Sequence, residues 1–319
     1  MMKKQRIFCW AFLGGSLLTG GCVSTVDEPA EDAAPISFAT TATRAAVDAD
    51  KNGMENFLVW GGFDSQNNLF NAEIVTKDGY YTGTRYWVAD KAHDFYALHP
   101  VSLKENASCE SGTITVIGFD TSIKRGTEAL DLMTASATGI TYQTGQIPAA
   151  VPLIFGHELS RVRFTIKTDA DVHISNVRLT GIAYKGDFTT KPDADAPWSN
   201  LTTATETDTP FSQTEVFELG ADGSRHLLAG IPDSNNENYG DLLLIPQSLS
   251  ETAVFTMTWT YDEDGRSRTV NVPLPRAGAG VWERGKSYRY TATIPLSATD
   301  ITLNVDVLDW NDRRVDADL

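Results

Sequence analysis

Apolar and polar residues alternate along most of the chain with a period of two, which is the pattern of half-buried β-strands. The clearest example is a hairpin: Phe255, Met257 and Trp259 alternate with threonines, residues 262–265 form a turn, and residues 269–272 return. Residues 242–245 are instead uniformly apolar, which indicates a strand buried on both faces. The same reasoning predicts further strands at residues 36–40, 57–60, 80–81, 86–88, 94–98, 112–117, 151–159, 161–167, 172–182, 288–294 and 301–307.

Helical periodicity is nearly absent, and only residues 127–135 would allow a helical turn or two. Residues 142–150 are rich in turn formers and predict a loop, at which we place a domain boundary. Residues 187–208 are polar and predict a long surface connection. The sequence therefore predicts an all-β protein of two tandem β-sandwich domains, at 45–149 and 150–319.

The first 21 residues have the composition of an export signal. The basic segment 3–6 precedes an apolar run from Ile7 to Leu18, which is too short to span a bilayer, and small residues then lead to Cys22. This arrangement resembles a bacterial lipoprotein signal, in which the cysteine takes a lipid and becomes the first mature residue. The alternative is ordinary signal cleavage nearby. We expect the lipid to hold a leader at 22–44, which contains the first strand, at a membrane surface.

The charge balance argues against one class of partner. The 319 residues contain 42 acidic and 26 basic side chains, a formal charge of -16, whereas a nucleic-acid-binding protein needs a basic face to meet phosphates. Cys9 lies in the export signal and Cys22 carries the expected lipid, so only Cys109 remains and no internal disulfide can form. We expect Cys109 to be structural rather than nucleophilic.

The sequence has no signature of catalysis or metal binding. Its five histidines lack a two-histidine metal spacing, and it has neither a nucleophile elbow nor a phosphate-binding glycine loop. Residues 48–53 begin like a calcium-binding loop, but Val59 stands where a bidentate glutamate should be, so a polar turn fits them better. We therefore expect no enzyme, no cofactor and no metal site.

Several short segments occur in an order that covers nearly the whole mature chain. They begin with Cys22, the strand at 36–38 and Thr43-Arg44-Ala45, and continue with 57–61, 94–100, 153–160, 243–247, 282–288 and 309–310. Together they resemble the fimbrillin family, whose members are subunits of type V pili exported as outer-membrane lipoproteins. The resemblance implies two transthyretin-like β-sandwich domains in a surface-exposed fimbrium.

The resemblance also implies a mechanism of assembly. In stalk subunits of the family, an arginine-specific protease cuts after an arginine in an early loop and removes the lipidated leader with the first strand. A strand from a neighbouring subunit then fills the vacated sheet edge. On this chain the implied cut lies between Arg44 and Ala45, and the displaced strand is 36–40, with Ile36 and Phe38 as its large apolar residues. Otherwise, Arg44 is an exposed loop cation.

The carboxy-terminal strand is either the last strand of the core or the donor. Its apolar residues are Ile301, Leu303, Val305 and Val307. Only a charged tail, 311–319, follows Trp310, whereas a stalk subunit should carry a more strand-like extension. We therefore expect a tip, minor or anchored subunit that acts in pilus assembly and cell adhesion, with other pilus subunits and the outer membrane as partners.

An alternative function is an anchored surface lipoprotein that binds host or bacterial glycans, because sugars stack on flat aromatic rings. Its candidate residues are Trp60, Tyr80, Tyr81, Tyr86 and Trp87. The same rings could equally fill the core of a sandwich. A solvent-facing aromatic platform would favour glycan binding, whereas an apolar groove under the first strand would favour strand exchange.

Overall fold

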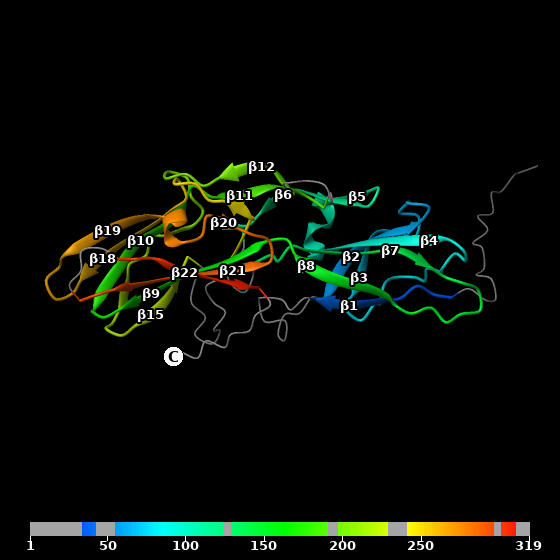
Figure 1. The fold of residues 1–319 in the computed structure, drawn as a ribbon, viewed down its shortest axis with the longest axis horizontal. Coiled ribbons are helices and arrows are strands. Elements are labelled where there is room, and N and C mark those ends of the chain that lie inside the picture. The colour runs from blue at the N-terminus through cyan, green and yellow to red at the C-terminus, as the bar shows by residue number, and fades with distance from the viewer. Residues whose placement is uncertain are drawn as a thin grey trace, which may run out of the picture.

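The computed structural model describes residues 34–42, 55–123, 129–190, 197–228, 241–296 and 301–310. Within these ranges the chain forms twenty-two β-strands and two short 3-10 helices, η1 (Val101–Asn106) and η3 (Leu274–Ala277). The expectation of an all-β protein is confirmed. The strands form several sheets, which are distributed along the long axis of the molecule (Figure 1).

The first sheet contains the first strand of the chain at one edge. Its order is β1 (Phe38–Ala42), β8 (Val151–His157), β7 (Met133–Thr141), β4 (Ala92–His99), β2 (Asn56–Phe63) and β3 (Phe70–Thr76). The pair β1–β8 is parallel, whereas the other neighbours are antiparallel. An edge strand has hydrogen-bonded neighbours on one side within its sheet, so what lies on the other side of β1 decides how firmly it is held.

The second sheet joins the two halves of the sequence. Its order is β12 (Trp198–Thr203), β11 (Ala183–Thr189), β6 (Thr113–Asp120) and β5 (Ala107–Glu110). Three pairings cross the boundary expected between residues 149 and 150, since β11 pairs with β6 and β8 pairs with both β7 and β1. The division of the chain into domains at this point therefore stays a prediction.

The third and fourth sheets form the carboxy-terminal part of the molecule. The third sheet has the order β13 (Ser212–Gln213), β10 (Val172–Thr180), β18 (Val254–Tyr261) and β19 (Ser267–Pro273), with β14 (Phe217–Leu219) also pairing with β10. The fourth has the order β15 (Ser224–Leu227), β9 (Ser160–Thr168), β21 (Lys286–Ile294) and β22 (Asn304–Asp309), with β16 (Asp241–Leu244) also pairing with β9. A small fifth sheet pairs β17 (Gln247–Ser248) with β20 (Val281–Trp282).

Three clusters of buried apolar side chains hold these sheets together. The carboxy-terminal cluster combines residues of the third and fourth sheets, and alternate residues of β9 (Val162, Phe164 and Ile166) point into it, as expected. The middle cluster combines residues of the first and second sheets, among them Trp60 and Phe188. The amino-terminal cluster lies on the other face of the first sheet.

β2 and β16 each belong to two clusters at once. Alternate residues of β2 enter the amino-terminal cluster (Phe57) and the middle cluster (Trp60). In the same way β16 places Leu242 in the carboxy-terminal cluster and Leu243 in the middle one. Burial on both faces explains why both sequences are uniformly apolar rather than alternating, and it confirms the expectation for residues 242–245.

Three expectations from the sequence are wrong. Residues 133–135 begin β7 instead of a helical turn, because Met133 and Ala135 alternate into the amino-terminal cluster. The expected surface connection at 187–208 contains β12, whose Trp198 is buried in the middle cluster. Residues 80–88 form no strand and make only an isolated bridge between Tyr86 and Pro35, although Trp87 is buried.

A buried ionic cluster connects β9 and β16. The carboxylate of Asp241 accepts hydrogen bonds from the guanidinium groups of Arg161 and Arg163, and all three side chains are buried. Burial favours the neutral acid, but the two guanidinium groups outweigh it and hold the pKa of Asp241 below its usual range. The carboxylate therefore stabilises the folded state above its unfolded pKa, and this contribution is lost as the pH falls below that value.

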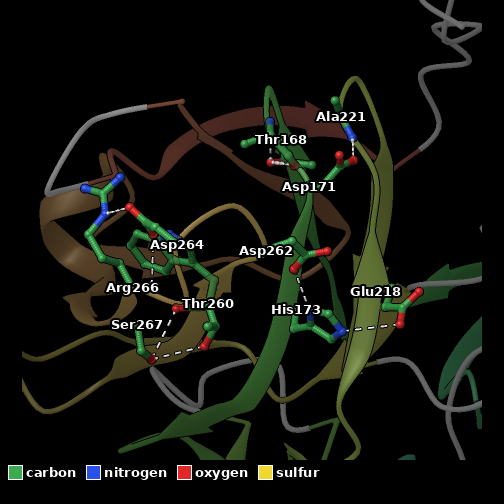
Figure 2. A network of polar contacts seen from close by, with 12 residues as sticks. Thr168, Asp171, His173, Glu218, Ala221, Thr260, Asp262, Asp264, Arg266 and Ser267 are labelled. Atoms are coloured by element: carbon green, nitrogen blue, oxygen red, sulfur yellow. Dashed lines mark hydrogen bonds and ion pairs between the residues drawn. The ribbon is translucent and has the colours of Figure 1, made fainter.

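A second polar network lies at the surface of the third sheet (Figure 2). His173 Nδ1 is 2.6 Å from Asp262 Oδ1, and His173 Nε2 is 3.3 Å from Glu218 Oε1. The hydrogen bond to Asp262 is the main reason why the pKa of His173 is raised. The protonated imidazole thus connects β10 with β14 and with the turn after β18. Its stabilising effect is present below pH 6.5 and is lost as the pH rises through the higher folded value.

We predict that Asp241→Asn lowers the free energy of unfolding by about 3–5 kcal/mol, because two buried guanidinium groups lose their counter-charge. Guanidinium chloride unfolding at neutral pH measures the change. The matched control is Asp264→Asn, which removes an exposed carboxylate paired with Arg266 and should leave the midpoint near that of the parent. Equal midpoints for the Asp241 variant and the parent would contradict this account of the cluster.

Candidate functional site

Residues 34–42, which we call the closing segment, complete the first sheet. On one side β1 pairs in parallel with β8, from Phe38 opposite Val151 to Ala42 opposite Phe155, and the Val151 N–H donates to the Ser37 carbonyl oxygen at 2.7 Å. Figure 1 shows β1 at the lower edge of the amino-terminal part of the molecule. The sequence-predicted displaced strand, 36–40, lies within this segment.

The other side of the closing segment is bonded to residues 85–87, which follow β3. The Ile36 N–H donates to the Arg85 carbonyl oxygen at 2.8 Å, and the Trp87 N–H donates to the Ala34 carbonyl oxygen at 3.0 Å. The closing segment thereby connects β8 with the loop that follows β3, the strand at the opposite edge of the sheet. We call the space between β8 and residues 85–87 the strand site.

Two side chains of the closing segment point into the amino-terminal cluster. Ile36 is 3% exposed and Phe38 is 4% exposed, whereas Ser37 and Ala39 face solvent. The Phe38 ring makes edge-to-face contacts with four rings, at centroid distances of 5.3 Å to Phe70, 5.5 Å to Phe95, 6.2 Å to Tyr81 and 6.5 Å to Phe57. Burial of each large apolar side chain contributes about 1.5–3 kcal/mol, and each aromatic pair adds about 0.5–1.5 kcal/mol.

Tyr81 and Arg85 cover the site from the loop that follows β3. The Tyr81 hydroxyl donates to the Ile36 carbonyl oxygen at 2.7 Å, and burial raises the pKa of Tyr81, so the hydroxyl stays protonated. The Arg85 guanidinium lies over the Phe70 ring, 5.8 Å from its centroid, and donates through Nε to the Leu69 carbonyl oxygen. The sequence pattern indicated Tyr81 only as one of several aromatic residues, and it carried no signal for Arg85.

His93 supports the segment that pairs with Ile36. The Val88 N–H donates to His93 Nε2 at 3.3 Å, and Nδ1 lies 3.0 Å from the Lys91 carbonyl oxygen, so the ring is neutral with its proton on Nδ1. Its edge meets Trp87 at 4.9 Å between centroids. His93 is fully buried, and this burial lowers its pKa. Protonation would turn Nε2 into a donor that faces the Val88 N–H.

The candidate donor strand is paired within its own chain. β22 runs antiparallel to β21, Ile301 and Leu303 are buried in the carboxy-terminal cluster, and Val305 packs against it. Val307 is 49% exposed. In the structure this segment therefore ends the chain's fourth sheet, and its role as a donor stays a prediction.

Trp310, directly after β22, is fixed in the middle cluster. Its ring stacks on His157 at 4.1 Å between centroids, and its backbone N–H donates to the Gly285 carbonyl oxygen at 3.0 Å. His157 in turn contacts Asp131 through Nδ1. Release of the last strand would therefore break contacts in two clusters.

Most aromatic residues of the alternative glycan site are not available to a sugar. Trp60 and Trp87 are 2% and 5% exposed, Tyr81 is bonded to the closing segment, and Tyr86 is half-buried. Only Tyr80 of these five is well exposed, at 74%. The set belongs largely to the interior and does not form a solvent-facing platform.

Cys22, Arg44, Ala45 and the segment 48–53 lie outside the described residues. Cys109 is buried, and burial raises the pKa of its thiol to about 11, so it is a poor nucleophile. Within the described ranges no group of three or more histidine, cysteine or acidic side chains is placed to hold a metal ion. None of the helices in these ranges has the length and apolar character that crossing a membrane requires.

Comparisons with known proteins cover most of the chain. Residues 40–310 match a family model described as fimbrillin-like. A fimbrial protein of Bacteroides vulgatus is 14% identical, with a TM-score of 0.58 over 86% of this chain and 99% of that one. A candidate cell adhesion protein of Bacteroides ovatus is 14% identical, with a TM-score of 0.52 over 87% and 98%. Another, of Bacteroides uniformis, is 18% identical, with a TM-score of 0.50 over 89% and 100%. No curated protein matches the chain.

We predict that Phe38→Ala lowers the free energy of unfolding by about 3–5 kcal/mol, because it empties the pocket between four rings. Chemical denaturation of the full chain, followed by tryptophan fluorescence, measures the effect. Ala39→Ser, at the exposed neighbouring position, is the control and should change stability by no more than about 0.5 kcal/mol. Similar losses for both variants would show that Phe38 does not anchor the segment.

We also predict that acid weakens the amino-terminal part of the molecule through His93. Its folded pKa lies below the usual 6.5, so stability is full above that value and falls as the pH drops through it. His93→Gln should lower the unfolding midpoint at about pH 7.5 but flatten its decline toward about pH 5.5. His173→Gln is the control of opposite sign. Because the pKa of His173 is raised, the protonated ring stabilises the fold at low pH, so its loss should make the midpoint decline more steeply toward acid. An unchanged slope in the His93 variant contradicts the prediction.

Proposed function

The chain belongs to the fimbrillin-like family, and we propose that it is a fimbrial subunit of the cell surface that acts in pilus assembly and cell adhesion. The observation that carries the proposal is the closing segment. It extends a sheet, fills an aromatic interior and is joined covalently to the strands that follow it through the residues after Ala42. The similar solved structures, of a fimbrial protein and of candidate cell adhesion proteins, support the same role.

The proposed assembly step begins with proteolysis. A cut between Arg44 and Ala45 would sever the closing segment from β2 without touching any described strand. Departure of the segment would leave β8 and residues 85–87 with unpaired backbone groups, and would expose the rings around Phe38. An extended strand from another subunit would restore both the hydrogen bonds and the burial, which is the physics of strand addition at a sheet edge.

The remaining parts of the chain fit a subunit at an end of the fibre. The export signal and a lipid on Cys22 would place the new subunit on the outer membrane before it is cut. β22 is committed to β21 and Trp310 is buried, so the chain is better suited to receive a strand than to donate its own. We therefore propose a tip, minor or anchored subunit, with a structural rather than a catalytic role.

The identity of the amino-terminal residue tests the proposal. On protein recovered from the native cell surface we expect Ala45, because the protease releases everything before it. Arg44→Lys should retain the leader with a blocked, lipidated Cys22, because an arginine-specific protease no longer cuts there. Arg276→Lys, at an arginine that is 70% exposed, is the control and should be processed normally. A blocked Cys22 on the unaltered surface protein would refute assembly by leader removal for this chain.

A further inference from the structure

The strand site requires different kinds of residue at successive positions of the strand that fills it, which we call the occupant. Ile36 and Phe38 point into the interior, while Ser37 and Ala39 point to solvent. Ile36 uses both of its backbone polar groups, since its N–H donates to the Arg85 carbonyl and its own carbonyl accepts the Tyr81 hydroxyl. An occupant therefore needs an N–H at this position, which excludes proline.

The backbone at Phe38 is also closely confined. Gly79 has a φ of +85°, and a Cβ atom there would lie 2.4 Å from the Phe38 carbonyl oxygen. Glycine thus lets the turn after β3 approach the occupant's main chain. The occupant is held at a fixed depth, so the side chain at the Phe38 position cannot withdraw from its pocket.

That pocket is shaped for an aromatic ring. Phe70, Phe95, Tyr81 and Phe57 all present themselves to Phe38 at interplanar angles between 69° and 88°. Such edge-to-face contacts depend on the charge distribution of a ring, which an aliphatic side chain of similar volume does not have. Leucine would bury apolar area there but would lose all four contacts.

The last strand of this chain does not meet the requirement for an aromatic side chain at the Phe38 position. Its alternating apolar residues, Ile301, Leu303, Val305 and Val307, include no aromatic ring. The same strand is already paired with β21, and Trp310 beyond it is buried against His157. The last strand of a second copy is therefore a poor source of the occupant.

We propose that the strand site selects its partner by an aromatic side chain at the Phe38 position, and hence takes an extended segment of a different subunit rather than the last strand of a second copy. This rests on the proposed exchange of the closing segment. The partner's segment has an aliphatic residue with a free N–H two positions before its aromatic residue, and small or polar residues between and after them.

An exchange assay on the full chain tests the proposal. A recognition sequence for a sequence-specific protease is inserted between Arg44 and Ala45, so that release does not depend on natural processing. After cutting, the amino-terminal fragment carries a fluorescent label, and peptides are added over a range of concentrations. The first peptide has the sequence of residues 34–41, the second carries Phe38→Leu, the third carries Ile36→Pro, the fourth has the sequence of 301–308, and the fifth is scrambled.

We expect the first peptide to displace the labelled fragment. The leucine peptide should need a concentration at least about ten times higher for the same displacement, which corresponds to about 1.4 kcal/mol of binding free energy. The proline peptide and the 301–308 peptide should do no better than the scrambled one. If the leucine or the 301–308 peptide displaces the fragment as well as the first peptide does, selection by an aromatic ring is wrong although strand exchange stands. If no peptide displaces it, strand exchange itself fails.

Two variants of the site separate recognition of the ring from recognition of the backbone. Tyr81→Phe removes the hydroxyl that binds the Ile36 carbonyl but keeps the ring. It should weaken the binding of the first peptide and of the leucine peptide equally, and so leave unchanged the ratio of the two concentrations needed for displacement. Phe70→Leu removes one of the four rings and should lower the ratio. Tyr80→Phe, at an exposed position, is the control. A ratio that stays constant in the Phe70 variant would overturn the proposal.

Discussion

The backbone groups that face the strand site need hydrogen-bond partners, because a buried N–H or carbonyl without one costs about 1–3 kcal/mol. The closing segment supplies these partners to β8 through residues 37–42 and to residues 85–87 through residues 34–36. The aromatic residues inside depend on the same segment, since Phe38 is their common neighbour. Backbone hydrogen bonding and the burial of aromatic rings therefore both require a strand in this site.

The rest of the molecule holds this site in a fixed relation to the carboxy-terminal sheets. β8 continues into β9 through Glu158, whose buried carboxylate accepts hydrogen bonds from Thr134 at 2.6 Å and Arg284 at 2.8 Å. Those two residues come from β7 and from the turn before β21. Trp310 adds a further contact across the same region by stacking on His157. A load applied to a strand in the site would thus pass through β8 directly into the carboxy-terminal part.

The period of two in the sequence was enough to predict an all-β fold and the inward face of β9, because a single buried face imposes strict alternation. Uniformly apolar residues 242–245 predicted burial on both faces for the same reason. The strands expected within residues 80–88 do not form. Aromatic residues favour strands, but here they lie in a loop and fill the interior. The pocket around Phe38 could not be predicted, because its rings come from four separate segments that only the tertiary fold brings together.

Covalent connection explains how such a site could stay closed before assembly and open during it. While the closing segment is joined to β2 through residues 43–54, it competes for the strand site as an intramolecular partner, at an effective concentration on the order of millimolar. A strand of another subunit, present at far lower concentration, could not displace it even with equal contacts. In the proposed exchange, a cut between Arg44 and Ala45 would change no contact of the closing segment but would remove this advantage. The released segment would then leave by dilution, and the strand with the better contacts, above all at the Phe38 position, would take its place.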